Sequence, residues 1–378
     1  MKIGIVCYPT FGGSGVLATE LGIELSKRGY EIHFITYNQP VKLELLSNKV
    51  HYHEVVVPDY PLFHYQPYEL ALSTKVVDMV KKHEIELLHV HYAIPHAYAA
   101  YMAKNMLKYE GINIPVVTTL HGTDITLVGS HPSYKAAVEF SINKSDAVTA
   151  VSESLKKDTE ELFNININIE VIPNFINLDK YPSERKDKNR SIIAKNDEKI
   201  ICHISNFRKV KRIDDVINTF YNINKKIPSK LMMVGEGPEK RSAEKLCKKL
   251  NIKDNVFFFG NTNETINILS FSDLFLLPSS TESFGLAALE AMASFVPVIS
   301  TNAGGLPEVN IDGVSGYMSN VGDIDDMVNN SLKILSNSKV NNEFKENARK
   351  QAEKYNIHKI VPFYESIYIA AMNKIDKQ

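Results

Sequence analysis

Two glutamates spaced eight residues apart offer the clearest chemistry in this sequence. Glu282 stands beside a Ser-Phe-Gly turn, and Glu290 lies inside the helix-like segment SFGLAALEAMA that begins at this turn. Carboxylates near a helix start and two turns along it need partners that donate hydrogen bonds. Sugar hydroxyls are such donors, and one carboxylate can bind both hydroxyls of a ribose diol. A salt bridge from Glu290 to a neighbouring helix is the alternative.

A second group of candidate residues is basic. The segment SNFRKVKR (205–212) lies between a predicted strand and a predicted helix, and its donors are Asn206, Arg208, Lys209, Lys211 and Arg212. A basic cluster at a helix N-terminus suits a diphosphate. A solvated basic turn is the alternative.

A glycine-rich loop, GGSG at 12–15, follows the first predicted strand and opens the first predicted helix. Glycines allow the backbone to approach a ligand closely, and a helix N-terminus favours an anion. The loop does not match GxGxxG, and no acidic residue ends the second strand. A nicotinamide site is therefore poorly supported, and a tight turn without a ligand remains the alternative.

Histidines gather where two predicted strands end. His89, His91 and Tyr92 end one strand, and His121 and Asp124 follow the next. The spacing lacks the cysteine or carboxylate pattern of a zinc site, so we expect these residues to line a pocket. His121 beside Asp124 is the better candidate for a polar contact with a substrate.

One further motif could hold a metal. The segment GDIDD (322–326) contains an Asp-x-Asp pair, which binds a divalent ion in some sugar-transfer enzymes. Its position before an apolar helical pattern favours an N-cap and an acidic first turn instead.

The elements that must position these residues alternate between strand and helix, which predicts an α/β fold with parallel sheets covered on both faces. The predicted strands are 2–8, 31–37, 86–92, 114–122 and 146–152, then 199–205, 230–238, 255–260, 273–279 and 296–301. The predicted helices are 16–29, 212–227, 241–250, 265–272, 283–293, 327–337 and about 360–375. Ligands bind such sheets at the carboxyl ends of the strands, where the motifs above fall.

The chain has 378 residues, which is too many for one ordinary core. The pattern restarts near residue 199, so we expect an N-terminal Rossmann-like domain at 1–172 and a C-terminal one at 173–359. The stretch 171–190, rich in Pro, Asn and charge, reads as the linker. The helix at about 360–378 could cross back to pack on the first domain.

The composition excludes several function classes. The net charge is −1, with 43 basic and 44 acidic residues, which gives no support to a nucleic-acid or polybasic membrane role. We expect no membrane span, since the longest apolar runs fall short of about 18 residues. The start lacks signal-peptide features. The three cysteines form no CxxC pair, so we expect reduced thiols and a cytoplasmic protein.

The segment TESFGLAALEAMA resembles the Glu-x7-Glu signature of retaining glycosyltransferases of the glycogen-synthase-like group, which have the GT-B fold. Segments around it resemble the C-terminal domain of that family in the same order: LMMVGEGPE, VFFFG, DLFLLPS, VPVIST, AGGLPE and GVSGYM. The motifs GGSG, HVHY and HGTD resemble its acceptor domain. The resemblance implies two Rossmann-like domains with parallel sheets facing across a cleft. The first domain would bind the acceptor and the second the nucleotide-sugar donor.

Within this group, the segments CYPTFGGSGV, HEVVV, HVHYAIPHA, TTLHGTDIT and ISNFRKVKR resemble a narrower family of bacillithiol-making bacteria. Its members join N-acetylglucosamine from UDP-GlcNAc to the 2-hydroxyl of L-malate, the first step of bacillithiol biosynthesis. The resemblance implies these two small-molecule substrates, retention of configuration, and neither a metal nor a cofactor. It leaves a homo-oligomer open.

The resemblance also assigns roles to residues. The catalytic set is His121, Glu282, Arg208 and Lys211. The donor-binding set is Gly13, Ser14, Gly15, Asn206, Glu282, Phe284, Gly285, Leu286 and Glu290, with the uracil near 257–260. The acceptor-binding set is Ser14, Tyr92, Thr119 and Arg208.

Two departures from the family pattern bear on these roles. Asn206 stands where the family has Arg, and Arg208 comes only three residues before Lys211, so Arg208 clamps either the diphosphate or malate. Ser294-Phe295 replaces the Gly that normally ends the helix after Glu290. A positive φ at Phe295 would cost on the order of 1 kcal/mol.

Three alternatives remain open from the residues. The acceptor could be another small molecule, such as an inositol phosphate or a lipid, since the sequence does not choose between Arg208, Lys42 and other cations for an acidic acceptor. The chain could be a hydrolysing sugar-nucleotide epimerase. It could also be a non-catalytic sugar-nucleotide sensor, which would fit poorly with an intact pair of Glu282 and Glu290.

Overall fold

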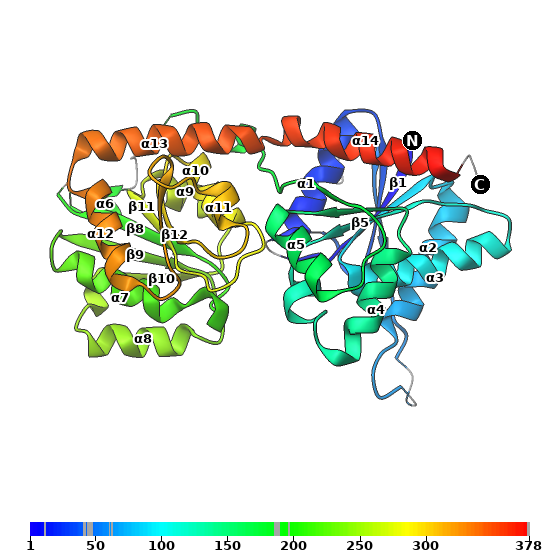
Figure 1. The fold of residues 1–378 in the computed structure, drawn as a ribbon, viewed down its shortest axis with the longest axis horizontal. Coiled ribbons are helices and arrows are strands. Elements are labelled where there is room, and N and C mark those ends of the chain that lie inside the picture. The colour runs from blue at the N-terminus through cyan, green and yellow to red at the C-terminus, as the bar shows by residue number, and fades with distance from the viewer. Residues whose placement is uncertain are drawn as a thin grey trace. The chain divides into compact units, whose positions relative to one another are not determined.

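The computed structural model describes residues 1–10, 13–40, 43, 48–59, 61, 63–184, 190–195 and 197–375. The chain forms two compact units (Figure 1): Met1–Phe175 with Ile357–Gln378, and Ile176–Asn356. Two residues singled out from the sequence, Gly12 of the glycine loop and Lys42, lie outside the described residues.

The first unit is built on a parallel sheet of seven strands in the order β3-β2-β1-β4-β5-β6-β7. The strands are β1 (Lys2–Val6), β2 (Glu31–Thr36), β3 (Val50–Glu54), β4 (Leu87–His91), β5 (Val116–Leu120), β6 (Ala147–Ala150) and β7 (Ile169–Val171). The order reverses between β1 and β4, so the loops after these two strands meet at the switch point where such sheets bind ligands.

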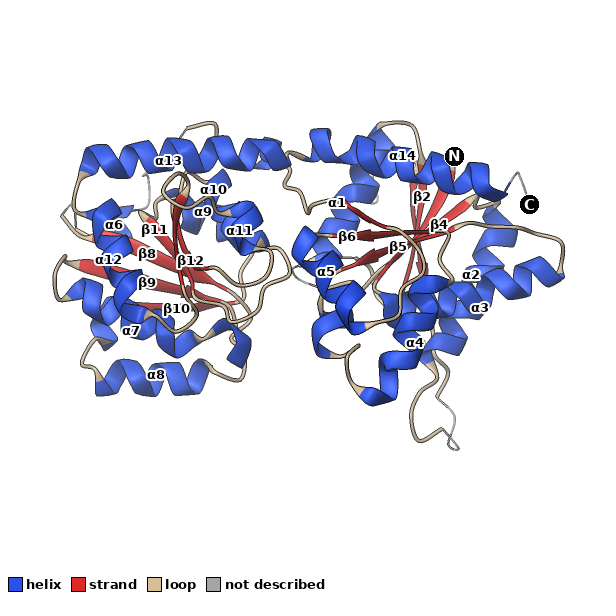
Figure 2. Ribbon diagram, in the orientation of Figure 1, coloured by secondary structure: helices blue, strands red, loops and turns tan. Residues whose placement is uncertain are grey.

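Helices cover both faces of this sheet (Figure 2). They are α1 (Ser14–Lys27), α2 (Tyr68–His83), α3 (Tyr98–Tyr109), α4 (Pro132–Asn143), α5 (Glu153–Leu162) and α14 (Ile357–Ile375). α14 packs against α1 and β5. Tyr368 of α14 is fully buried, and its hydroxyl lies 2.8 Å from Nδ1 of His89 on β4. The last helix is therefore part of the first unit's core.

The second unit has a parallel sheet of six strands in the order β10-β9-β8-β11-β12-β13. The strands are β8 (Lys199–Ile204), β9 (Ser229–Val234), β10 (Val256–Gly260), β11 (Leu274–Leu277), β12 (Val298–Thr301) and β13 (Gly316–Ser319). The helices are α6 (Arg190–Ile193), α7 (Ile213–Asn224), α8 (Lys240–Lys249), α9 (Thr265–Ser270), α10 (Leu286–Ala293), α11 (Leu306–Val309), α12 (Ile324–Leu335) and α13 (Ser338–Ala352).

Two parallel sheets with helices on their faces confirm the predicted α/β fold class. The capping role predicted for the Asp-x-Asp segment is also confirmed, because the Asp323 carboxylate accepts a hydrogen bond from the Asp326 amide at the start of α12. Among the helices that the structure describes, none has both the length and the apolar character needed to cross a bilayer.

Candidate active site

The turn from β1 into α1 brings the backbone close to itself. A Cβ atom on Gly15 would lie 2.4 Å from the Tyr8 carbonyl oxygen, so only glycine fits here. Gly13 caps α1 with φ of 57°, a conformation that favours glycine. Within the described part of the chain no side chain caps this helix end. Its amides therefore remain available to an anion.

Ser14 and Tyr92 meet beside this helix start. Their hydroxyl oxygens lie 2.5 Å apart, and both residues follow carboxyl ends of neighbouring strands. Tyr92 has φ of 83°, which is strained for a residue with a side chain. Its amide donates to the Thr119 carbonyl, and its ring lies 5.2 Å from the Tyr8 ring and 4.9 Å from the His121 ring. These contacts hold the Tyr92 hydroxyl toward Ser14.

The histidines at the strand ends take part in two hydrogen-bonded pairs. His91 Nδ1 lies 2.9 Å from His121 Nε2, and His89 Nε2 lies 2.8 Å from the Thr119 hydroxyl, which also bonds Thr149. Burial lowers the pKa of His89 and of His121 to about 3. Both rings are therefore neutral near pH 7. Thr119 is fully buried, so its hydroxyl acts inside the fold.

Asp124 organises the loop after β5. Its carboxylate accepts hydrogen bonds from the amides of Ala93 at 2.8 Å, Gly122 at 2.9 Å and His121 at 3.2 Å. Burial raises the pKa of Asp124 to about 6, although these amide bonds oppose the shift. The Asp124 carboxylate therefore fixes the backbone around His121, and His121 stays the predicted candidate for a polar contact with a substrate.

In the second unit, the two predicted catalytic groups Lys211 and Glu282 form an ion pair. Lys211 Nζ lies 2.6 Å from Glu282 Oε2, and the two side chains are only 17% and 16% exposed. The loops that carry them are joined by a hydrogen bond from the Ser280 amide to the Val210 carbonyl. The basic segment after β8 and the acidic turn after β11 therefore form one site.

Glycines hold the Glu282 turn in place. A Cβ on Gly304 would lie 2.0 Å from the Glu282 carbonyl oxygen, and one on Gly305 would lie 2.5 Å from the Ser283 carbonyl oxygen. The Gly305 amide donates to the Glu282 carbonyl at 2.9 Å. Gly285 caps α10 with φ of 101°, and among described residues no side chain caps this end. The first amides of α10 therefore remain available to an anion just after the Glu282 turn.

The remaining residues of this turn divide between core and surface. Phe284 is buried, and its ring lies 5.5 Å from the Tyr355 ring. Leu286 begins α10, and Glu290, one turn further along it, is half-buried. Phe295 has φ of 61°, as the missing glycine suggested.

The basic segment spreads its side chains in different directions. Asn206 and Arg208 are exposed, and Arg208 forms no ion pair with any residue that the structure describes. Arg212 Nε lies 2.5 Å from Asp215 Oδ2, so Arg212 has a different partner from Lys211. The segment is therefore not one cluster of five donors.

Sequence reasoning missed several residues that shape the site. Tyr8, His96 and the glycines 304 and 305 were not assigned roles. Tyr8 packs on His96 with ring centroids 4.5 Å apart, and His96 Nδ1 lies 2.6 Å from the His91 carbonyl oxygen. The repeated aromatic residues of HVHYAIPHA and the paired glycines of AGGLPE were the available signals.

Two family models match this chain, one to each half. Glycosyltransferase Family 4 matches residues 11–180, and Glycosyl transferases group 1 matches residues 184–351. Solved structures share the fold. A glycosyltransferase from Rickettsia africae has a TM-score of 0.80 at 20% identity, covering 98% of each chain. HepE of Anabaena in complex with UDP-glucose has a TM-score of 0.80 at 18% identity, covering 98% of this chain and 100% of that one.

The chain belongs to this family of glycosyltransferases and has the GT-B fold. Among individual proteins, it is 45% identical over 370 residues to N-acetyl-alpha-D-glucosaminyl L-malate synthase of Bacillus anthracis, covering 97% of this chain and 96% of that protein. A poly(ribitol-phosphate) alpha-N-acetylglucosaminyltransferase of Staphylococcus aureus is 28% identical over 261 residues, covering 68% of this chain and 50% of that one.

Proposed function

We propose that this chain transfers N-acetylglucosamine from UDP-GlcNAc to the 2-hydroxyl of L-malate with retention of the α-configuration, the first step of bacillithiol biosynthesis. The observation that carries the proposal is the 45% identity, over 97% of the chain, to a synthase named for that product. The ion pair and the uncapped helix starts supply groups that suit its two anionic substrates.

The second unit would bind the donor. A lysine ammonium has three donor hydrogens, so Lys211 can keep its bond to Glu282 and still donate to a phosphate oxygen. The amides of Gly285 and Leu286 at the start of α10 would add a partial positive charge for the diphosphate. Asn206 and Arg208 would reach the phosphates from the exposed turn after β8. Phe284 would place the neighbouring amides through its buried ring.

Two carboxylates would hold donor hydroxyls. Glu290 would bind the ribose diol, and Glu282, oriented by Lys211, would bind hydroxyls of the transferred sugar. A carboxylate accepts several hydrogen bonds at once, which matches a polyol.

The first unit would bind the acceptor. L-malate carries two carboxylates, and the uncapped start of α1 at Gly13, Ser14 and Gly15 offers amides to one of them. The bonded hydroxyls of Ser14 and Tyr92 would orient the attacking oxygen. Thr119 would act by positioning, because its buried hydroxyl fixes the His89 ring. The second carboxylate would take Arg208 in the alternative in which Arg208 binds malate and not the diphosphate.

The chemistry is a substitution at the anomeric carbon. The bond from C1 to the UDP oxygen breaks, the malate 2-hydroxyl forms a new bond to C1 on the same face, and its proton passes to the departing β-phosphate. Lys211 and the α10 amides would stabilise the negative charge on that phosphate. The His121 backbone carbonyl would face the positive charge that develops on the sugar.

The test is to mix the protein with UDP-GlcNAc and, separately, L-malate, D-malate, succinate, inositol phosphate or no acceptor. We expect UDP release only with L-malate, together with a product whose mass equals that of N-acetylglucosaminyl malate. NMR of the anomeric proton should report an α-linkage. Succinate lacks the hydroxyl and is the matched control, because it should bind without accepting the sugar.

Other outcomes would select the alternatives. UDP and free sugar released at equal rates with and without acceptor would indicate a hydrolysing epimerase. A product formed only with inositol phosphate would show that the acceptor is inositol phosphate and not L-malate. Tight UDP-GlcNAc binding with no product from any acceptor would indicate a sensor.

A further inference from the structure

Histidines and a glutamate gather at the amino end of the first unit's sheet, opposite the strand ends that carry Ser14 and Tyr92. Glu31 begins β2, where it pairs in register with the first residue of β1. His33 follows on the same strand, and its register partner on the edge strand β3 is His51. No role in sugar transfer has been assigned to these residues.

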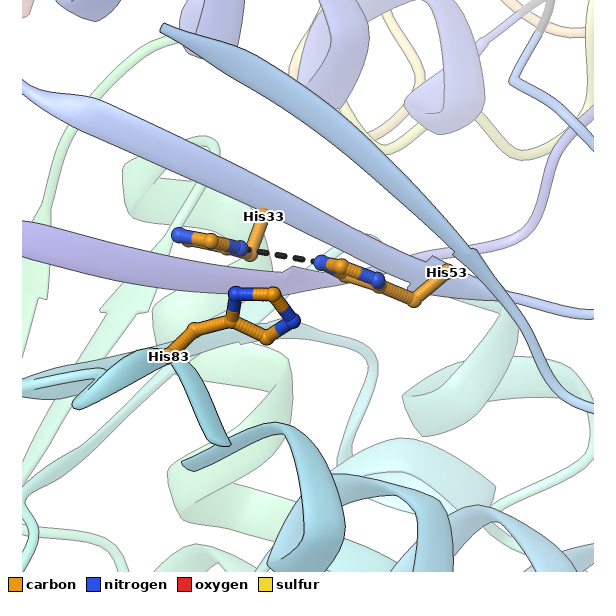
Figure 3. A group of neighbouring side chains, drawn as sticks. All are labelled: His33, His53 and His83. Atoms are coloured by element: carbon orange, nitrogen blue, oxygen red, sulfur yellow. Dashed lines mark hydrogen bonds between the residues drawn. The ribbon is translucent and has the colours of Figure 1, made fainter. Parts of the chain in front are cut away.

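The His33 ring has one nitrogen engaged and one unused. Its Nδ1 lies 2.9 Å from Nε2 of His53, the bond drawn in Figure 3, with His83 from the end of α2 beside both rings. The ring is fully buried, and its Nε2 has no hydrogen-bond partner among the residues described. Leaving a buried polar nitrogen unpaired is unfavourable, so the structure calls for a partner at this atom.

The unused nitrogen faces a carboxylate and a second unused nitrogen. Glu31 Oε1 lies 3.3 Å from Nε2 of His33 and 3.3 Å from Nε2 of His51. His51 Nε2 also has no hydrogen-bond partner within the described ranges. The three atoms therefore lie together without satisfying one another's hydrogen-bonding capacity.

The two separations from Glu31 Oε1 match those between ligand atoms around one ion. Ligand atoms at about 2.0–2.1 Å from a tetrahedral zinc ion are separated by about 3.3–3.4 Å along each edge. In that arrangement the lone pairs of the ligand atoms point at the metal and not at each other. Two ligand atoms can therefore lie about 3.3 Å apart without forming a hydrogen bond. All three ligand atoms lie within 4.8 Å of one another.

We propose that Glu31, His33 and His51 form a binding site for a divalent transition-metal ion, with Zn²⁺ the best match to two imidazoles and one carboxylate. The Glu31 and His51 side chains are 37% and 36% exposed, so the site lies near the surface of the unit. His53 holds the His33 ring through the other nitrogen, the second contact that metal-binding histidines usually make.

The ion would have a structural role. It would join the edge strand β3 to β2 through side chains, in addition to the backbone ladder. The ammonium of Lys2, the register partner of Glu31 on β1, donates to Glu84 Oε2 at 3.0 Å and to the His83 carbonyl at 2.9 Å. The site therefore differs from the sugar-transfer residues in place, ligands and purpose.

The experiment measures metal binding to the full-length protein without a polyhistidine tag. After chelator treatment, we expect titration with Zn²⁺ to load one tightly bound ion per chain, measured by elemental analysis after gel filtration. Co²⁺ should give the intense visible bands of a four-coordinate ion. Added Zn²⁺ should raise the Tm by a few degrees, a readout independent of activity.

Matched variants test whether Glu31 and His51 bind the ion. Glu31→Gln and His51→Gln are half-exposed changes that should leave the fold intact and weaken Zn²⁺ binding at least tenfold. His358→Gln is the control, because it removes another half-exposed histidine of the same unit that lies 3.0 Å from a carboxylate. Its Zn²⁺ affinity should equal that of the unchanged protein.

Two results would overturn the proposal. One is Zn²⁺ binding in Glu31→Gln and His51→Gln that is as tight as in the unchanged protein, or absent from all of them. The other is loss of binding in His83→Gln but not in His51→Gln, which would place an ion among His33, His53 and His83 instead. Neither result bears on sugar transfer, which is assayed separately.

Discussion

Replacing Lys211 by methionine tests the proposed diphosphate clamp. The change keeps most of the side chain's volume and removes the ammonium that lies 2.6 Å from Glu282 Oε2. Both side chains are about one-sixth exposed, at 17% and 16%, so the pair lies between a surface pair and a buried one. We expect the unpaired Glu282 carboxylate to lower the free energy of unfolding by about 1–3 kcal/mol, less than for a fully buried pair because water still screens it.

The effect on the reaction should be larger than the effect on stability. Losing one group that stabilises the leaving phosphate costs about 10²–10³ in kcat, or roughly 3–4 kcal/mol of the barrier. UDP release with saturating L-malate measures this loss, and urea unfolding measures the stability. Lys209→Met is the matched control, because Lys209 is an exposed cation two residues away. It should change kcat by less than about threefold.

A double variant separates the two roles of Lys211. Combining Lys211→Met with Glu282→Gln removes both charges, so part of the lost stability should return, with a coupling of about 0.5–3 kcal/mol. The kcat should stay low, since the phosphate still lacks its cation. A kcat in Lys211→Met close to that of the unchanged enzyme would refute the assignment. Recovery of kcat in the double variant would show that Lys211 serves only to neutralise Glu282.

Three further predictions concern stability. Asp124→Asn should lower the free energy of unfolding by about 1–3 kcal/mol, because the side-chain NH₂ group must point at one of the backbone N–H groups that now donate to the carboxylate. Urea unfolding measures this loss, with the exposed Asp78→Asn as the control. Equal stability of the two variants would contradict the hydrogen-bonding account. Phe295→Gly relieves on the order of 1 kcal/mol of backbone strain but removes a buried ring, so we expect a net loss of about 2–4 kcal/mol in the same assay; a stabilised variant would show that strain dominates. Burial lowers the pKa of His89 and His121 to about 3 in the folded protein, so below pH 6.5 these histidines become protonated only in the unfolded chain. For each histidine, the free energy of unfolding should therefore fall by about 1.4 kcal/mol for each pH unit below 6.5. Burial raises the pKa of Asp124 to about 6, so between about pH 4 and 6 its protonation in the folded state should offset the loss of stability from one histidine. Unfolding curves that coincide at pH 7.5, 6.5 and 5.5 would contradict the predicted loss of stability at low pH.

Strong local patterns predicted most of the fold. Runs such as KIICHIS and DLFLLPS are apolar on both faces, as buried parallel strands must be, and both became strands, β8 and β11. The edge strand β3 was missed because its sequence, VHYHE, has one apolar residue that is buried and four positions that are partly exposed or exposed. β7 was missed because three residues carry too little pattern.

The candidate site was predictable in its residues but not in their pairing. The glutamates and the basic segment were visible as motifs, whereas the bond between Lys211 and Glu282 joins loops 71 residues apart. The contacts of Asp124 could not be predicted, because a carboxylate beside a histidine in sequence gives no sign that three backbone amides will donate to it. Phe295 shows the opposite case: a residue standing where glycine is usual led to the positive φ that is observed.

The position of α14 has a consequence for how the chain acquires its structure during synthesis. α14 adds buried residues, among them Tyr368, to a core that otherwise consists of residues from the first 175 positions, whereas the second unit lies wholly within 176–356. A ribosome releases the N-terminus first, yet the N-terminal unit cannot finish its core until the final helix emerges. The second unit can therefore fold completely before α14, the last helix of the first unit, has been synthesised. This order is the reverse of the usual one, in which the N-terminal domain folds first on the ribosome.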